Sequence, residues 1–305
     1  MDFSVQCFGQ KLKNPLIAAS GCFGFGQEAT EWQDVTLWGA ICSKGVTREP
    51  RLGNPSPRVI ETASGMLNSV GLQNPGIEVF QQEILPQMKA LGTEIIVNIA
   101  GRNTEDYLEC ASLLESEDVL ALEINLSCPN VTQGCMSMGT DARLVRQIIS
   151  EIKKVSHHPL IAKLTPNTSN IAEIATAAEE GGADAISLVN TFLGMAVDLH
   201  TRRPCLKNNT GGLSGPAIKA IALRMVHEVC QVVDIPVIGL GGIMNGRDVL
   251  EYILVGATAV EVGTANFLRP CFPRDCLREM KAICESEGIS SLDELRGSLI
   301  LWPKP

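Results

Sequence analysis

One cysteine lies where a side chain could do chemistry. Cys128 follows the apolar segment 121–125 in the run Asn125-Leu126-Ser127-Cys128-Pro129-Asn130, in which the proline ends regular structure. A thiol near a cation such as Lys44 can become a thiolate, which acts as a nucleophile or as a base. None of the four histidines ends an apolar segment, so a Cys–His nucleophilic pair has no candidate partner. The residues therefore favour proton transfer by Cys128 over acyl transfer.

Polar side chains end most of the other apolar segments. A single Asn at such a place is more often a turn former than a ligand. Several polar residues at equivalent positions require an explanation, because a buried polar group costs free energy when it is unpaired. Asn offers a donor and an acceptor, which suits the edge of a pyrimidine or another amide-bearing ring. The set consists of Lys44, Asn98, Asn125, Lys163, Asn190 and Thr191.

Glycines follow the last two apolar segments, at Gly241-Gly242 and Gly263-Thr264. In a (β/α)8 barrel, phosphate often binds in the loops after strands seven and eight, beside a helix N-terminus. The glycine-rich segment 211–215 could close the same site with backbone N–H groups. The pattern predicts a phosphorylated cofactor or substrate.

Eight short apolar segments alternate with helical patterns. Continuous apolarity is typical of parallel strands that are buried on both faces. The alternation predicts a (β/α)8 barrel, with a doubly wound open sheet as the alternative fold. No linker divides the chain, so we expect one domain over residues 1–305, with an insertion loop at 48–57. The predicted strands are 16–20, 40–44, 95–99, 121–125, 160–164, 185–189, 236–240 and 259–262, and the predicted helices include 104–115, 141–155, 172–180, 218–232 and 247–255.

Composition excludes several classes of protein. A net charge of -9 and only 13 aromatic residues argue against a nucleic-acid binder. No uninterrupted apolar run is long enough to span a membrane. Eleven cysteines with no CxxC pair fit neither a disulfide scaffold nor a metal site. We expect a cytoplasmic protein with free thiols and no bound metal.

Four motifs, in order along nearly the whole chain, resemble the cysteine-type (class 1) dihydroorotate dehydrogenases. The motif 125–131 resembles the family's catalytic loop, and 19–26 its first strand and loop. The motif 64–76 resembles its substrate loop, and 210–216 the segment before its seventh strand. The likeness is strongest to class 1B, the catalytic subunit that works with an iron–sulfur flavoprotein.

The resemblance implies FMN as the cofactor and dihydroorotate and orotate as the substrate pair. The residues implied to contact FMN are Ser20, Lys44, Gly45, Asn98, Asn125, Lys163 and Val189, with Gly215, Gly241, Gly242, Gly263 and Thr264 at its phosphate. The residues implied to bind the pyrimidine and its carboxylate are Lys44, Asn68, Ser69, Val70, Gly71, Leu72, Asn125, Asn190 and Thr191.

The resemblance also implies a mechanism. Cys128 removes a proton from C5 of dihydroorotate while the hydride at C6 passes to N5 of FMN. Lys44, the second catalytic residue, holds the substrate and stabilises developing charge. Lys163, near the pyrimidine end of the flavin, favours the reduced ring. The implied assembly is a homodimer of catalytic subunits joined by partner subunits that carry FAD and an iron–sulfur cluster, with NAD+ as the final acceptor.

One segment departs from the family pattern. Residues 134–139 read Gly-Cys-Met-Ser-Met-Gly, where the family more often has Gly-Gly and a Phe. Gly134 and Gly139 remain as hinges for a lid. Cys135 is a rival thiol, but Cys128 lies nearer the strand end and matches the motif. The first strand begins near Leu16, so the membrane-associating extension of class 2 is not expected.

Three other functions stay open from the sequence. The first is a class 1A-like homodimer that reduces fumarate without a partner. The second is another FMN-dependent pyrimidine dehydrogenase. The third belongs to a different class: a non-catalytic barrel that binds a phosphate or metabolite through its backbone glycines and amides.

Overall fold

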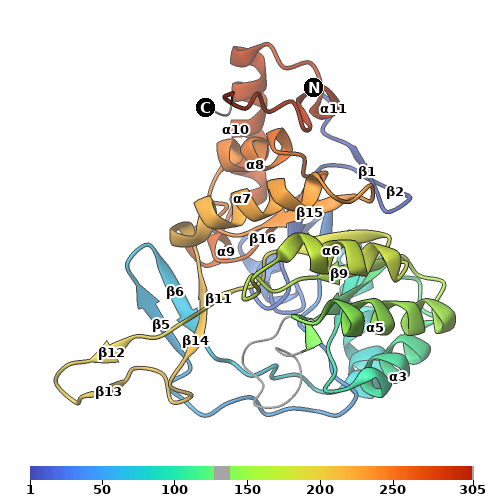
Figure 1. Cartoon of the computed structure of the whole chain (residues 1–305), viewed down its shortest axis with the longest axis vertical. Coiled ribbons are helices and arrows are strands. Elements are labelled where there is room, and N and C mark those ends of the chain that lie inside the picture. The colour runs from blue at the N-terminus through green and yellow to red at the C-terminus, as the bar shows by residue number, and fades with distance from the viewer. Residues whose placement is uncertain (127–137, 304–305) are drawn as a thin grey trace.

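Eight parallel strands close into a barrel, as predicted (Figure 1). The computed structural model describes residues 1–126 and 138–303. Each barrel strand is short, and nearly every residue in it is buried, which is why these segments read as unbroken apolar runs. In order around the barrel, the strands are β3 (Leu16–Ala18), β4 (Ala40–Cys42), β7 (Glu94–Ile99), β8 (Ala121–Asn125), β9 (Leu160–Lys163), β10 (Ala185–Leu188), β15 (Val237–Leu240) and β16 (Ala259–Val262).

Helices between the strands cover the outside of the barrel. Several begin at a polar residue whose side chain accepts a backbone N–H: Asn103 from Asp106, and Asn245 from Asp248. The five predicted helices are confirmed within two residues at each end. The helices are α1 (Ile77–Val79), the π-helical turn η3 (Phe80–Ile84), α2 (Leu85–Lys89), α3 (Thr104–Leu114), α5 (Ala142–Val155), α6 (Ile171–Glu180), α7 (Lys219–Cys230), α8 (Gly246–Leu254), α9 (Ala265–Leu268), α10 (Phe272–Glu287) and α11 (Leu292–Leu295).

A four-stranded antiparallel sheet, which we call the roof sheet, is built from two connections far apart in sequence. It contains β5 (Val59–Thr62) and β6 (Gly65–Asn68) from one connection, and β11 (Phe192–Gly194) and β14 (Gly211–Ser214) from the other. The strand order is β11-β14-β6-β5, so the two connections meet where β6 pairs with β14. The sequence did not predict this sheet.

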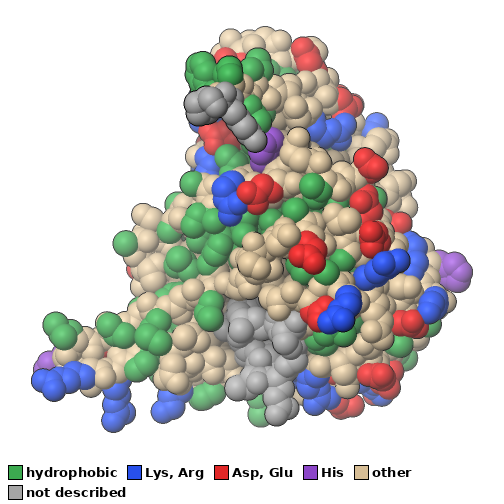
Figure 2. Space-filling view, viewed as in Figure 1, with side chains coloured by type: hydrophobic (Ala, Val, Ile, Leu, Met, Phe, Trp, Pro, Cys, Tyr) green, Lys and Arg blue, Asp and Glu red, His purple; other side chains and the backbone are tan. Residues whose placement is uncertain are grey.

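Smaller elements complete the chain. A hairpin of β12 (Val197–Asp198) and β13 (Arg203–Pro204) projects from the roof sheet as an arm (Figure 1). Figure 2 shows hydrophobic and basic side chains gathered on this arm. The remaining elements are β1 (Val5–Cys7), β2 (Gln10–Leu12) and the 3-10 turns η1 (Glu28–Glu31), η2 (Val35–Leu37) and η4 (Pro216–Ile218).

The described residues contain nine cysteines, and all nine are free thiols. Burial raises the pKa of most of them, including Cys7, Cys110 and Cys230, each to about 12. These thiols therefore act as small apolar side chains of the core. Within the same residues, no helix is long and apolar enough to cross a membrane.

Candidate active site

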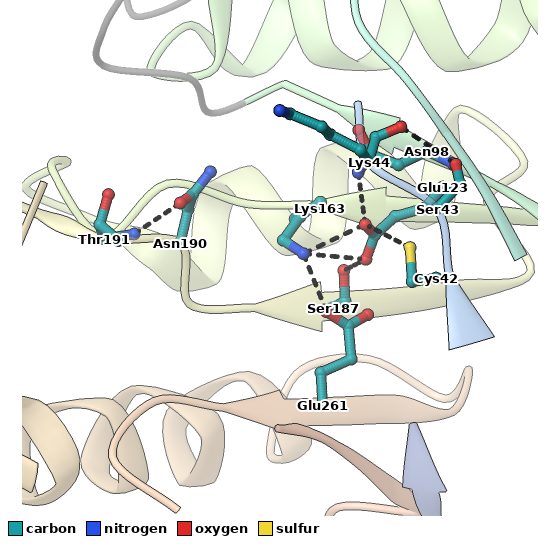
Figure 3. A network of polar contacts seen from close by, with 10 residues as sticks. All are labelled: Cys42, Ser43, Lys44, Asn98, Glu123, Lys163, Ser187, Asn190, Thr191 and Glu261. Atoms are coloured by element: carbon teal, nitrogen blue, oxygen red, sulfur yellow. Dashed lines mark hydrogen bonds and ion pairs between the residues drawn. The ribbon is translucent and has the colours of Figure 1, made fainter. Parts of the chain in front are cut away.

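A cluster of charged and polar side chains fills the centre of the barrel (Figure 3). Lys163 Nζ lies 3.1 Å from Glu123 Oε2 and 2.8 Å from Glu261 Oε2. Glu123 also accepts hydrogen bonds from Ser187 Oγ at 2.8 Å and from Asn98 Nδ2. Cys42 Sγ donates to the same carboxylate at 3.3 Å. Six barrel side chains, from β4, β7, β8, β9, β10 and β16, thus converge on one point; we call them the barrel cluster.

Strand geometry explains this convergence. Side chains alternate between the two faces of a strand, so Glu123 shares the inward face with Asn125 two residues later. The register places Asn98 of β7 opposite Glu123, and Asn125 opposite Lys163 of β9. All of these side chains are almost completely buried. A charged group at such a place needs partners, and the neighbouring strands supply them.

Burial and charge act on the barrel cluster in opposite directions. Burial alone would lower the pKa of Lys163, but the Glu123 and Glu261 carboxylates raise it above its usual range. Burial alone would raise the pKa of Glu123, but Lys163 and the hydrogen bonds lower it to about 2. The pKa of Glu261 is raised well above its ordinary value by burial and by the negative charge of Glu123. The two carboxyls therefore differ in acidity: the pKa of Glu123 is lowered and that of Glu261 is raised.

A cavity lies beside the barrel cluster, at the carboxyl ends of β10, β15 and β16. Gly241 and Gly242 turn the chain after β15 with φ values of +129° and +68°, which favour glycine. Tyr252 Oη donates to the Gly241 carbonyl at 2.7 Å and holds this turn on α8. We call it the glycine-lined cavity; its walls include Ser20, Cys22, Lys163, Val189, Asn190, Thr191, Ser214, Gly215, Gly241, Gly242, Glu261, Gly263 and Thr264.

A second cavity adjoins the first. The two share Ser20, Cys22, Asn190, Thr191 and Ser214 as walls. The roof sheet supplies one side of the second cavity. We call it the Lys44 cavity; its walls include Ser20, Gly21, Cys22, Lys44, Gly45, Val59, Met66, Asn68, Val70, Gly71, Leu72, Asn125, Asn190, Thr191, Ser214 and Phe267.

Lys44 points away from the barrel cluster (Figure 3). It lies half-buried two residues beyond β4, and within residues 1–126 and 138–303 no carboxylate forms an ion pair with it. Burial lowers its pKa, Arg58 lowers it further, and Glu28 opposes both. An ammonium with this environment is available to an anionic ligand.

The roof sheet also sets the position of Thr191. A Cβ on Gly212 would lie 2.0 Å from Thr191 Oγ1, so only glycine fits at this point of β14. Thr191 N donates to Asn190 Oδ1 at 2.7 Å. Tyr107 Oη of α3 donates to the Asn125 carbonyl at 2.8 Å, which holds the end of β8. Polar residues from the end of β8 and from the connection after β10 are thus fixed around one hollow.

The structure brings together most of the predicted site residues. The predicted phosphate residues all line the glycine-lined cavity, and the predicted pyrimidine residues other than Ser69 line the Lys44 cavity. Asn98 and Ser69 line neither; both are fully buried, and Asn98 donates to Glu123 instead. Cys128, Cys135 and Gly134 lie outside the described residues.

Comparison with known proteins identifies the family. The family model described as "Dihydroorotate dehydrogenase" matches residues 2–284. A chain from Alkaliphilus metalliredigens, named "Dihydroorotate dehydrogenase B (NAD(+)), catalytic subunit", is 52% identical over 299 residues, covering 98% of this chain and 99% of its own. Relatives with the same name from Geotalea uraniireducens (98% of each chain covered) and Bacillus pumilus (96% and 95% covered) are 50% and 49% identical.

This chain belongs to the dihydroorotate dehydrogenase family. The resemblance read from the four sequence motifs is thereby confirmed, and the chain is an enzyme of the dihydroorotate dehydrogenase type. The (β/α)8 fold predicted from the alternation of apolar segments and helical patterns is confirmed as well.

Sequence reasoning missed two residues of this dihydroorotate dehydrogenase site. Glu123 and Glu261 lie inside strands and not at their ends, where polar residues were sought. A signal was nonetheless present, since each interrupts an apolar run and lies two residues before a predicted site residue, Asn125 or Gly263. Strand alternation places such a pair on one face.

Proposed function

We propose that this chain is the catalytic subunit of an NAD+-linked dihydroorotate dehydrogenase of pyrimidine biosynthesis. The observation that supports this most directly is the pair of adjoining cavities in a chain of this family. Two ligands in them would meet at the shared walls, Ser20, Cys22, Asn190, Thr191 and Ser214. A cofactor and a substrate need this contact to exchange a hydride.

We assign FMN to the glycine-lined cavity, with its ring reaching the shared walls. There Gly45 and Asn125, from the adjoining Lys44 cavity, and the buried Asn98 behind Gly45 would lie near the ring. The donor set fits, because Gly215, Gly241, Gly242 and Gly263 line this cavity with backbone groups, and Thr264 Oγ1 is positioned by a 2.9 Å hydrogen bond to Ser214 Oγ. Bound FMN supplies the hydride acceptor that the amino acids lack.

We assign dihydroorotate to the Lys44 cavity. Lys44 binds the carboxylate or a carbonyl oxygen of the ring, and its ammonium stabilises negative charge as it develops there. Asn68, Asn125 and Asn190 present amides from three elements, which matches the alternating donors and acceptors of a pyrimidine. Cys128 takes the proton from C5 in this proposal, and a cation such as Lys44 would favour its thiolate.

The partner part of the proposal rests on other features. The relatives are named as catalytic subunits, which implies a second subunit; we propose an iron–sulfur flavoprotein with FAD. The projecting arm exposes Met195, Val197 and Leu199, the kind of apolar surface that pairs with another chain, and we propose a homodimer within a heterotetramer. Free thiols throughout the described core suit a single-domain enzyme of the cytoplasm.

The test starts from the absorbance spectrum of the purified chain. We expect an FMN spectrum that dihydroorotate bleaches without oxygen, and NAD+ reduction only when an iron–sulfur flavoprotein is added. Reduction of fumarate by the isolated chain would instead assign the class 1A-like activity. Ligand binding without flavin reduction would assign a non-catalytic barrel.

A variant of Cys128 tests the proton transfer. Cys128→Ala should keep FMN bound but slow its reduction by dihydroorotate about 10²–10⁴-fold, the usual contribution of a positioned base. The matched control is Cys205→Ala, which removes a free thiol outside both cavities and should change nothing. Unchanged kinetics in Cys128→Ala would remove this residue from the mechanism.

A further inference from the structure

The barrel cluster holds two carboxyls and one ammonium. The side chains of Glu123 and Glu261 are 0% exposed and that of Lys163 is 5% exposed. With both carboxyls ionised, the cluster would hold one negative charge without a counter-ion. A buried charge of this kind is strongly unfavourable, and it is relieved when one of two neighbouring carboxyls keeps its proton.

The hydrogen bonds decide which carboxyl keeps the proton. Glu123 accepts from Lys163, Ser187, Asn98 and Cys42, which stabilises its ionised form. In the part of the chain that the structure describes, Glu261 accepts from Lys163 alone, through Oε2. Among the described residues, its other oxygen, Oε1, has no hydrogen-bond partner although it is buried. A protonated carboxyl needs fewer donors than a carboxylate does, so the proton belongs on Glu261.

We propose that Glu261 is a neutral carboxylic acid in the folded enzyme and a positioning residue for Lys163. The ion pair of the barrel cluster is then Glu123 with Lys163, and the cluster is neutral as a whole. The proton of Glu261 then lies in a hydrogen bond between the two carboxyls, which Glu261 donates and Glu123 accepts. Glu261 and Lys163 both line the glycine-lined cavity. The consequence for FMN rests on the proposed function: the bound ring would face an ammonium with no excess negative charge behind it.

The other groups that face Glu261 agree with this assignment. Cys42 of β4 lies within 4.8 Å of its carboxyl, and Cys22, in the turn after β3, lines the same cavity. Burial raises the pKa of both thiols, that of Cys22 to about 11, so both are neutral. Lys163 of β9 is the one cation facing Glu261 in the described part of the chain, and it is already paired with Glu123. The pKa of Glu261, which is raised above its ordinary value, also favours the protonated carboxyl.

Infrared spectroscopy of the full chain tests the proposal directly. A protonated carboxyl has its own C=O stretching band, which shifts in D2O. We expect this band near neutral pH in the wild type, with and without FMN, and its loss in Glu261→Gln. In Glu123→Gln, Lys163 pairs with Glu261 instead, so the band should disappear even though residue 261 is unchanged. The control Glu94→Gln, at an exposed position of β7, should keep the band.

Unfolding by urea gives an independent measurement. An ordinary glutamate ionises on unfolding, so the folded wild type binds one more proton than the unfolded chain. The equilibrium constant for unfolding of the wild type should therefore rise with pH relative to that of Glu261→Gln. The ratio of the two constants should increase about tenfold for each pH unit between about pH 5.5 and 7.5. Glu123→Gln should follow Glu261→Gln, and Glu94→Gln should follow the wild type.

Two results would overturn the proposal. One is a wild-type spectrum without the band, or a band that persists in Glu261→Gln. The other is the same pH slope in the wild type and Glu261→Gln. If Glu261→Gln does not fold, the presence of the band in the wild type and its loss in Glu123→Gln still test the proposal. A chain that binds no FMN would contradict the proposed function, whereas the band in the FMN-free chain would still test the charge of Glu261.

Discussion

Lys163 is the last residue of β9 and Lys44 lies two residues beyond β4 of the same barrel, yet their surroundings are opposite. Lys163 is buried between two carboxyls, which raise its pKa. Lys44 is half-buried at a cavity wall, and its pKa is lowered by burial and by Arg58. The first lysine already has its counter-ion, so it stabilises the barrel. The second has none among the described residues, so its charge is available to a ligand. Position along the strand decides between these roles.

The largest effect expected is on folding. Lys163→Met leaves Glu123 and Glu261 buried without a cation, and it should lower the free energy of unfolding by about 3–5 kcal/mol. Lys44→Met should change it by less than about 0.5 kcal/mol, because no ion pair is broken. Urea denaturation of both variants measures the difference. Equal losses of stability would show that the two lysines are not distinct.

The next prediction concerns activity, for which Lys44 and not Lys163 is the residue that matters most. Lys44→Met should lower kcat/KM for dihydroorotate by about 10²–10³-fold, since a cation aimed at developing charge is lost. The flavin spectrum should remain, because the walls of the glycine-lined cavity are untouched. Steady-state kinetics with a dissolved acceptor measure this loss. A Lys44→Met enzyme with wild-type kcat/KM would assign the substrate to another place.

A third prediction concerns acid. The ordinary pKa of Glu123 is 4.5 and the folded value is about 2, so its contribution to stability is present above 4.5 and is lost as the pH falls toward 2. The slope should be about 1.4 kcal/mol per pH unit. A triple variant, Glu123→Gln with Lys163→Met and Glu261→Gln, should lack this slope and recover stability lost in Lys163→Met alone. Lys44→Met should keep the slope. Denaturation at several pH values measures this slope, and a triple variant that kept the slope would contradict the prediction.

The smallest effects concern the pKa of Lys44. Arg58 lowers this pKa and Glu28 raises it. Arg58→Gln should therefore move the basic limb of dihydroorotate binding to higher pH, and Glu28→Gln should move it to lower pH. Each shift should be a few tenths of a unit, since the charges act across solvent. Shifts in the same direction would contradict this assignment of charge.

The barrel and most of its strand-end residues could be predicted because both depend on local sequence. An apolar run predicts a buried strand, and the residue that ends it predicts a position at the mouth. Glu123 and Glu261 were missed because their partners come from other strands, and the register that joins them is not local. Neither the pairing of Gly212 with Asn68 nor the close approach of Thr191 leaves a mark in either segment alone.

The pairing of β6 with β14 has a consequence for synthesis of the chain. Asn68 pairs with Gly212, and 212 − 68 is 144 residues. At the usual rate of translation, roughly 5–20 residues per second, β6 waits about 7 to 30 seconds for its partner strand. During this time β6 can pair with β5 on one side, but its other edge is open and another chain could pair with it. One edge of residues 65–68 is therefore exposed on the ribosome, long before there is any substrate to bind.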